Sequence, residues 1–385
     1  MSILHVGSFC YVDFALTGSF VIHMYLRRQR QEIAAVVLTA AGFAVISMLQ
    51  SVPGPNYIGS FAGRPGAFLG LGSIVVLAVK VTWMSGDNRP SLVKALRWTM
   101  VFPLLCIGSA VALVIAAYFT PTTYDLFLHA FDLTLGAPAY VVGRLFREHS
   151  VLAGACFVIY NTLPLYVSVF MIVRCTHRNG SRTDFALACA TLGVLGFLLY
   201  QVCPGTNPRD AVGGFPYSPP AVSVDALAKV PVLPSIPRNA TPSLHIGWIL
   251  LCFWNARGLG ISARVISTIY LVLTALATLG TGEHYLIDLV VAVPLCLCVQ
   301  AICLRGADRF SGLRLGSLVT GGVLTLAWLI ALRTGVAAHY TSPAISWTLA
   351  SATVVLSCLL EACLRPQAAV REARAIPAEF EIVAQ

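Results

Sequence analysis

The chain has 385 residues, of which 57% are hydrophobic and 11% are charged, and its formal net charge is +9. Soluble domains carry about 25% charged residues because their surfaces face water, so this composition excludes an ordinary soluble protein. A positive charge can indicate nucleic-acid binding, but here the charges lie between long apolar segments, and no nucleic-acid partner is expected. The composition predicts an all-α fold, a polytopic helical bundle in a membrane.

A helix that crosses the hydrocarbon core needs about 20 apolar residues. The sequence predicts about eleven such transmembrane helices. They are 9–25, 34–52, 66–84, 96–118, 151–174, 184–203, 242–257, 262–280, 284–303, 315–333 and 345–363. The segments 242–257 and 262–280 are short or flanked by polar residues, and we expect them to pack inside the bundle rather than against lipid.

The predicted spans divide the chain into four parts. These are N-terminal transmembrane helices at 1–119, a central region at 120–305 that holds the motifs below, C-terminal transmembrane helices at 306–363, and a cytoplasmic tail at 364–385. With the amino terminus outside, most of the 25 Lys and Arg residues fall in cytoplasmic segments, as the positive-inside rule requires. Two long segments are then external.

The two external segments differ in their predicted structure. The first, 120–150, is expected to contain an interfacial helix near 124–135. The second, 204–241, contains too many prolines for a regular helix. Loops of this length without regular structure are usually functional or disordered.

A first polar motif follows the second external segment and reads Arg238-Asn239-Ala240-Thr241-Pro242-Ser243-Leu244-His245. Thr241 is a suitable helix cap, and Pro242 suits the first helical position. The free backbone N–H groups and the positive dipole end of this helix would face outward and favour phosphate. Ser243 and His245 fall in the first turn, and Arg238 lies just before it.

A second polar motif is Gly280-Thr281-Gly282-Glu283-His284-Tyr285-Leu286-Ile287-Asp288. Its glycines interrupt the preceding span, and a new helix is expected to begin near Glu283. His284 and Asp288 are four residues apart and would share one helix face. A hydrogen bond from one imidazole nitrogen to Asp288 would leave the other nitrogen as a nucleophile. Arg209, on the long external loop, could contribute a further positive charge.

Together these motifs resemble the type-2 phosphatidic acid phosphatase superfamily. The resemblance rests on Pro242-Ser243-Leu244-His245 followed by His284 with Asp288, and it covers about residues 120–305. It is closest to the branch that holds inositol phosphorylceramide synthases and sphingolipid synthases. The stretch Tyr200 to Pro216 is similar to the first motif of that branch.

The resemblance implies a six-helix catalytic core that acts on a lipid phosphate, phosphosphingolipid or phospholipid without a metal or cofactor. His284 would attack phosphorus and form a phosphohistidine, Asp288 would orient it, and His245 would protonate the leaving oxygen and then deprotonate water or an alcohol acceptor. The phosphate would be bound by Arg209, Arg238 and Ser243. Such an enzyme is expected in a bacterial inner membrane with its site facing the periplasm.

The sequence departs from the phosphatases of this superfamily at two places. The stretch before His284 reads Ala277-Thr278-Leu279, where those phosphatases carry a Ser-Arg pair, and Gln201 to Arg209 contains no lysine. These departures make simple phosphatidate hydrolysis a weaker prediction than membership of the superfamily.

Two other functions remain open from the sequence. A transporter or lipid-binding scaffold with a decayed site would not need the intact His245, His284 and Asp288. An enzyme like the vanadate-dependent haloperoxidases shares the phosphate-like pocket, but such enzymes are mostly soluble. The 12 cysteines contain no Cys-x-x-Cys pair and are expected to be small core residues rather than metal ligands.

Overall fold

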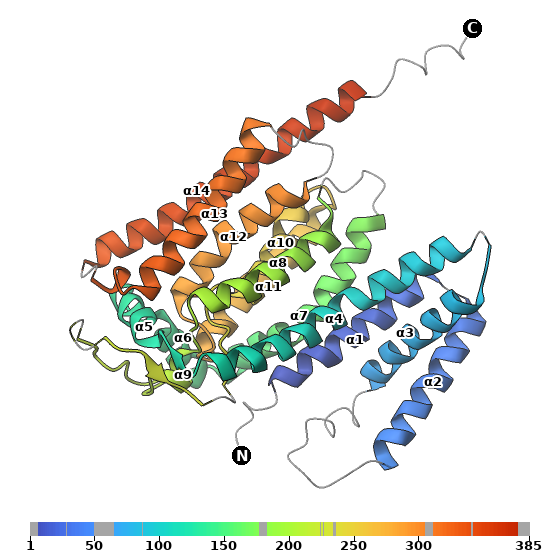
Figure 1. The fold of residues 1–385 in the computed structure, drawn as a ribbon, viewed down its shortest axis with the longest axis horizontal. Coiled ribbons are helices and arrows are strands. Elements are labelled where there is room, and N and C mark those ends of the chain that lie inside the picture. The colour runs from blue at the N-terminus through green and yellow to red at the C-terminus, as the bar shows by residue number, and fades with distance from the viewer. Residues whose placement is uncertain are drawn as a thin grey trace.

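The computed structural model describes residues 7–27, 29–49, 65–86, 88–176, 183–223, 225, 227–233, 236–304, 311–339 and 342–375 (Figure 1). The described chain is almost entirely helical. The long helices are α1 Gly7–Leu26, α2 Arg30–Leu49, α3 Pro65–Trp83, α4 Arg89–Phe119, α7 Ser150–Thr176, α8 Phe185–Val202, α11 Ile261–Gly280, α12 Leu286–Cys303, α13 Gly312–Arg333 and α14 Pro343–Ala375. The shorter elements are β1 Thr122–Thr123, α5 Asp125–Thr134, α6 Pro138–Glu148, α9 Pro208–Ala211, β2 Val230–Pro231, α10 Leu244–Asn255 and the 3₁₀ turn η4 Ala337–His339.

Eight helices in the described part of the chain are long and apolar enough to cross a membrane: α3, α4, α7, α8, α11, α12, α13 and α14. The pair α5 and α6, bent by 79°, would make nine if it counts as one span. The chain is therefore an integral membrane protein with an all-α bundle, as predicted. The count of eleven is not confirmed. The other three predicted spans are also helices, but α10 has only 12 residues, and α1 is described as apolar only over Val12–Leu26.

Helix α12 lies at the centre of the bundle and packs against α8, α10, α13 and α14. In the apolar segment of α12, 83% of the residues are buried, whereas in that of α11 only 22% are buried. The prediction that 262–280 packs inside the bundle is therefore wrong. Ser267, Thr274 and Thr278 lie on the buried face of α11, whereas the exposed residues of this helix include Val265, Ile269 and Val272. Polar residues in the sequence therefore did not indicate a helix inside the bundle.

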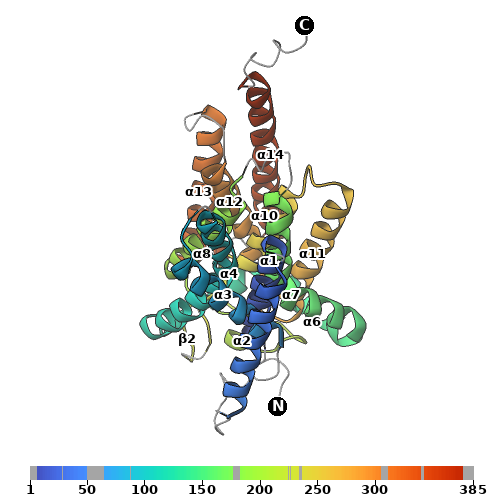
Figure 2. The same cartoon turned by 90° about the vertical axis from the view of Figure 1, so that its right-hand side faces the viewer.

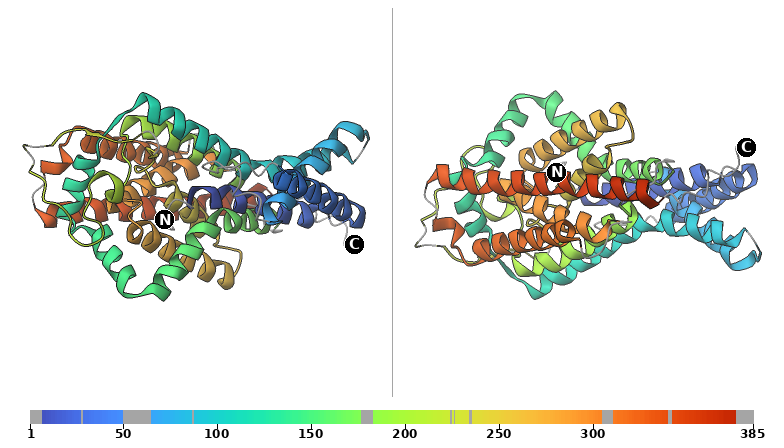
Figure 3. Two further views of the ribbon diagram at one scale, coloured as in Figure 1. Left: turned by 90° about the horizontal axis from the view of Figure 1, so that it is seen from below. Right: turned by 90° about the horizontal axis from the view of Figure 1, so that it is seen from above.

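The N-terminal helices form a group at one edge of the molecule. In both views of Figure 3 the blue N-terminal helices extend from one end of the molecule. Helix α1 joins this group to the bundle through contacts with α3, α4 and α7. Glu32 is completely buried in this group and is compensated by Lys80 at 2.6 Å, with Arg27 and His23 close by. A buried carboxylate needs such partners to be tolerated.

A layer of short elements covers one end of the central helices, and α14 ends on the opposite side (Figure 1). The helix predicted near 124–135 is present as α5, and its interfacial placement stays a prediction; α6 and the antiparallel β1–β2 pair were not predicted. Figure 2 shows α6 on the same side of the molecule as α11, where Phe146 fills the space that a Cβ at Gly280 would need.

The last helix continues past the predicted end of its span. The part of α14 that is apolar enough to cross a membrane is Pro343–Leu364, close to the predicted span 345–363, and the helix itself runs to Ala375. Residues 376–385 lie outside the described residues.

Candidate active site at the starts of α10 and α12

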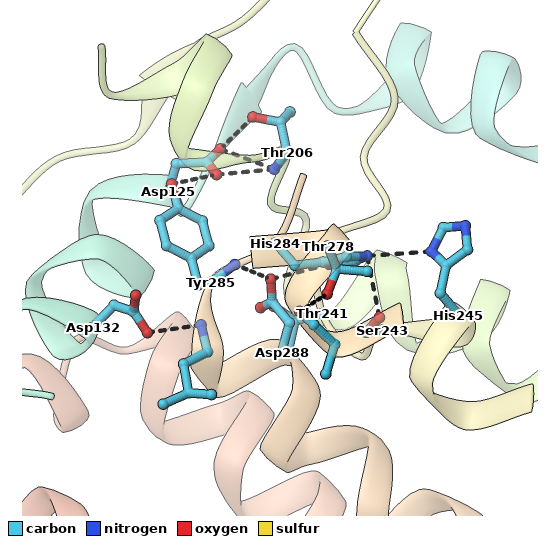
Figure 4. A network of polar contacts seen from close by, with 12 residues as sticks. Asp125, Asp132, Thr206, Thr241, Ser243, His245, Thr278, His284, Tyr285 and Asp288 are labelled. Carbon is cyan, nitrogen blue, oxygen red and sulfur yellow. Dashed lines mark hydrogen bonds and ion pairs between the residues drawn. The ribbon is translucent and has the colours of Figure 1, made fainter. Parts of the chain in front are cut away.

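Two helices begin side by side at the covered end of the bundle (Figure 4). Ser243 is the N-cap of α10 and Tyr285 the N-cap of α12, both in extended conformation. The backbone N–H of Ser243 donates to the carbonyl oxygen of Asp288 at 3.1 Å and ties the two helix starts together. The positive ends of both helix dipoles therefore point toward the same place.

The two helix starts bring the predicted histidines into contact. His245 Nδ1 lies 3.4 Å from His284 Nε2, and Ser243 Oγ lies 3.2 Å from the same Nε2 atom. His284 is buried, whereas His245 is partly exposed. The ring of Tyr160, from α7, packs on the His245 ring with 4.7 Å between centroids. The reactive edge of one histidine therefore faces the other.

Asp288 contacts His284 at the ring nitrogen that faces away from His245. Its Oδ2 atom lies 3.3 Å from His284 Nδ1 and accepts the backbone N–H of Tyr285 at 2.8 Å, while Oδ1 accepts the hydroxyl of Thr241. Because an ionised carboxylate only accepts hydrogen bonds, the proton of the imidazole is favoured on Nδ1. The lone pair of Nε2 then points toward Ser243 and His245.

Both helices start later than the sequence indicated. Helix α10 begins at Leu244 rather than at Pro242, because the Thr241 side chain donates to Asp288 instead of capping the helix. Helix α12 begins at Leu286 rather than near Glu283. His284 consequently lies in the turn before α12, and its contact with Asp288 is made across the helix start rather than along a helix face.

The turn before α12 has a defined conformation. Gly282 has φ +71°, which glycine adopts with little strain. The carbonyl oxygen of Thr278 accepts the backbone N–H groups of both Glu283 and His284, at 3.0 and 3.1 Å. These bonds fix the direction in which the His284 side chain leaves the chain.

Arg209 lies beside this turn. Its guanidinium donates to Glu283 Oε1 at 2.9 Å, to the carbonyl oxygen of Thr281 at 3.2 Å, and to both carboxylate oxygens of Asp210. Burial lowers the pKa of Arg209, but Glu283 and Asp210 raise it by more, so the net shift is upward and the guanidinium stays charged. Arg209 is thus ion-paired with Glu283, the residue that precedes His284 in the chain.

Arg238 is not brought into the site, contrary to the prediction. Its side chain is completely buried, and it donates to the carbonyl oxygens of Thr120, Val232, Leu233 and Ile236. Burial lowers its pKa from the ordinary arginine value. Since the guanidinium hydrogens are directed at loop carbonyls, Arg238 stabilises the proline-rich loop before α10 and is not available to a phosphate in this arrangement.

Two buried carboxylates of α5 were not predicted to take part. Asp132 Oδ1 accepts the backbone N–H of Leu286 at 2.9 Å, and Asp125 Oδ1 accepts the hydroxyl of Tyr285 at 3.1 Å. Both contact residues that immediately follow His284. Charged residues beside an apolar helix were the only signal in the sequence, and that signal does not identify the partner.

Residues 126–302 match the family model of the PAP2 superfamily. The matched PAP2-like region runs from α5 to α12 and contains His245, His284 and Asp288, and it agrees with the resemblance to type-2 phosphatidic acid phosphatases drawn from the motifs. No curated protein and no solved structure matches the chain significantly. The match is to the superfamily as a whole and does not distinguish the inositol phosphorylceramide synthase branch from the others.

Within the PAP2-like region the site offers a nucleophile, an acid–base group and an anion-binding side chain. His284 Nε2 can attack an electrophile, His245 can transfer a proton beside it, and the helix starts with Arg209 can bind negative charge. Among the described residues, no group of three or more His, Cys, Asp or Glu side chains is placed to hold a metal ion.

Proposed function

We propose that this chain is an integral membrane phosphotransferase that moves a lipid phosphodiester headgroup to an alcohol through a phosphohistidine at His284. The observation that carries the proposal is the alignment of three groups: Asp288 lies against Nδ1 of His284, while His245 lies against Nε2. A nucleophile, an orienting carboxylate and a proton donor in this order are what two-step phosphoryl transfer requires. The match to the PAP2 superfamily supports it.

The reaction consists of two displacements at phosphorus. In the first, the lone pair of His284 Nε2 forms a bond to phosphorus and the bond to the leaving oxygen breaks. His245, whose protonated form the bound phosphate anion favours, gives that oxygen its proton. In the second, neutral His245 takes the proton of an acceptor alcohol, whose oxygen attacks phosphorus as the P–N bond breaks. Asp288 stabilises the positive charge that develops on the imidazole in each step.

Substrate must change the contact between the histidines. A phosphoryl group bonded to Nε2 does not fit into a 3.4 Å separation between Nε2 and His245 Nδ1. The His245 ring therefore turns away when the phosphate enters, and an oxygen of the phosphate replaces the contact. Catalytic hydrogen bonds are commonly rearranged between the empty and the occupied site.

The charges around the site favour a phosphodiester over a phosphomonoester. Arg209 is the one Arg or Lys among the described residues that an ion pair or side-chain hydrogen bond links to the 281–288 turn, and it is balanced by Glu283 and Asp210. A monoester carries close to two negative charges at neutral pH, whereas a diester carries a single one. The smaller charge is better tolerated where the arginine is already paired.

The proposed orientation follows the loops. The site lies at the end of the bundle covered by α5, α6 and α9 (Figure 1), which the distribution of basic residues assigns to the exterior. A lipid would enter from the membrane with its headgroup at the histidines. A lipid alcohol such as ceramide would reach the site by the same route, whereas a water-soluble alcohol would arrive from the outer side. The branch that transfers phosphoinositol to a sphingolipid alcohol is the closest functional model.

The test is a headgroup-transfer assay on the purified chain in mixed micelles. Micelles would contain either phosphatidylinositol with ceramide or phosphatidate alone, with a chelator present throughout. We expect transfer from the diester that persists under chelator, is lost in His284→Ala and is retained in His339→Ala, a control at an exposed histidine on η4. Turnover that survives His284→Ala would contradict the mechanism. No turnover of any lipid would instead favour a transporter or scaffold.

A further inference from the structure

The site is assembled from two loops that are distant in sequence. One, residues 203–207, leads directly into α9, which carries Arg209, and the other, residues 281–288, carries His284. Helices α10 and α11 separate them along the chain. The distance between a guanidinium and a nucleophilic nitrogen on different loops depends on whatever holds those loops together.

Asp125, the first residue of α5, lies between the two loops and is completely buried. From the first loop it accepts the backbone N–H of Thr206 at 3.0 Å and its hydroxyl at 3.0 Å. From the second loop it accepts the hydroxyl of Tyr285 at 3.1 Å (Figure 4). Thr123 donates a further hydroxyl to Asp125.

Close packing keeps this arrangement tight. The carbonyl oxygen of Pro204 accepts the backbone N–H of Tyr124 at 2.9 Å. A Cβ at Gly205 would lie 2.5 Å from a methyl carbon of Leu128, so the first loop is pressed against α5. Burying a carboxylate is costly unless donors surround it, and here the donors come from both loops.

Tyr285 is fixed at both of its ends. Its backbone N–H donates to Asp288, and its hydroxyl donates to Asp125. His284 is its direct neighbour in the chain. The α5 face that carries Asp125 also carries Asp132, two turns later, which accepts the backbone N–H of Leu286. Helix α5 therefore contacts the start of α12 at two consecutive residues.

We propose that Asp125 and Tyr285 are positioning residues that set Arg209 relative to His284. The inference rests on the proposed function, because it assigns the pair to phosphate binding by that site. Neither side chain has a hydrogen bond to either histidine among the described contacts, so the pair acts through the two loops. Misplacement of a binding group by about 1 Å can cost a large factor in rate.

The experiment measures binding of orthovanadate, a phosphate analogue, to the purified full-length chain in detergent by calorimetry. Four proteins form a double-mutant cycle: wild type, Tyr285→Phe, Arg209→Ala and the double variant. Tyr285→Phe removes only the hydroxyl and keeps the ring. Thr206→Val removes a donor at the other end of the link and serves as a second variant. Tyr166→Phe, which removes a partly buried hydroxyl bonded to Ser267 between α7 and α11, is the matched control.

We expect Tyr285→Phe and Thr206→Val each to weaken vanadate binding about tenfold, the scale of one lost hydrogen bond to a charged group. Tyr166→Phe should bind as wild type does. In the Arg209→Ala background Tyr285→Phe should cause no further loss, because the link then has no arginine to position. A merely structural role would make the two losses additive.

Three results would overturn parts of the account separately. Additive losses, or wild-type affinity in Tyr285→Phe, would refute the positioning role while leaving the proposed function in place. A loss of equal size in Tyr166→Phe would show that any buried hydroxyl has this effect and would also refute it. Failure of the wild-type chain to bind vanadate would refute the phosphate site itself, and this inference with it.

Discussion

Replacing Asp288 with asparagine should separate the chemical role of this residue from its structural one. Its carboxylate faces His284 Nδ1, the backbone N–H of Tyr285 and the hydroxyl of Thr241. In Asp288→Asn the amide oxygen can keep the Tyr285 side of the network, and the amide NH₂ can donate to the Thr241 oxygen. The substitution nevertheless removes the negative charge beside Nδ1 of His284.

The structural cost of this substitution should be small and the chemical cost large. One imperfect hydrogen bond lowers the free energy of unfolding by about 1–2 kcal/mol. Loss of the charge that orients and stabilises the imidazole should lower kcat by about 10²–10⁴, by analogy with the aspartate of serine-protease triads. KM should change little, because Asp288 does not face the substrate.

The assay is lipid headgroup transfer, with thermal unfolding followed in parallel. Asp184→Asn is the matched control, since Asp184 also caps a helix start, at α8, outside the site. Its kcat should remain at the wild-type value. A kcat of Asp288→Asn within tenfold of wild type, at unchanged stability, would refute the assignment of Asp288 as the orienting group.

Three further substitutions test the remaining parts of the site. His245→Ala should slow transfer from natural lipids by about 10²–10⁴, but much less from a nitrophenyl phosphodiester whose leaving group needs no proton; equal losses on both substrates would contradict its role as acid. Glu283→Gln should raise the monoester-to-diester rate ratio by about two- to fivefold, the range for a partly exposed ion pair, and an unchanged ratio would remove the charge argument. Arg238→Lys should lower the free energy of unfolding by about 2 kcal/mol as bonds to loop carbonyls are lost, with vanadate affinity of the folded protein unchanged; weaker vanadate binding at full stability would restore Arg238 to the site.

The bundle and the histidine pair could be predicted because both depend on local patterns. Long apolar segments require helices in a membrane, where backbone groups must be paired internally. His245 and His284 each follow a break between such segments, so both were expected at helix starts. The structure places them 3.4 Å apart.

The helix starts were misplaced because a distant residue competes with local caps. Thr241 has the sequence features of an N-cap, but its hydroxyl donates to Asp288, and the helix starts only after Ser243. Propensity and spacing describe neighbours along the chain. They cannot indicate a hydrogen bond to a residue on another helix.

The hydrogen-bond and ion-pair partners of the charged side chains could not be predicted from the sequence either. Arg238 and Arg209 lie at similar positions beside polar motifs, yet one is directed at loop carbonyls and the other at carboxylates next to His284. Asp125 and Asp132 contact the start of α12 through the tertiary fold alone. Which charge meets which group is decided by the packing of α5 and the proline-rich loop before α10, which no local pattern specifies.

The central claim is that phosphorus becomes covalently bound to His284. The purified chain would be mixed with a lipid phosphodiester labelled at phosphorus, quenched in alkali during turnover and digested, and the labelled peptide sequenced. We predict that the label is bonded to His284 through an acid-labile P–N bond, with the transferred headgroup still esterified to the phosphorus, and that it is absent from His284→Ala. Steady turnover with no label on the protein, or with label on a different residue, would contradict the account.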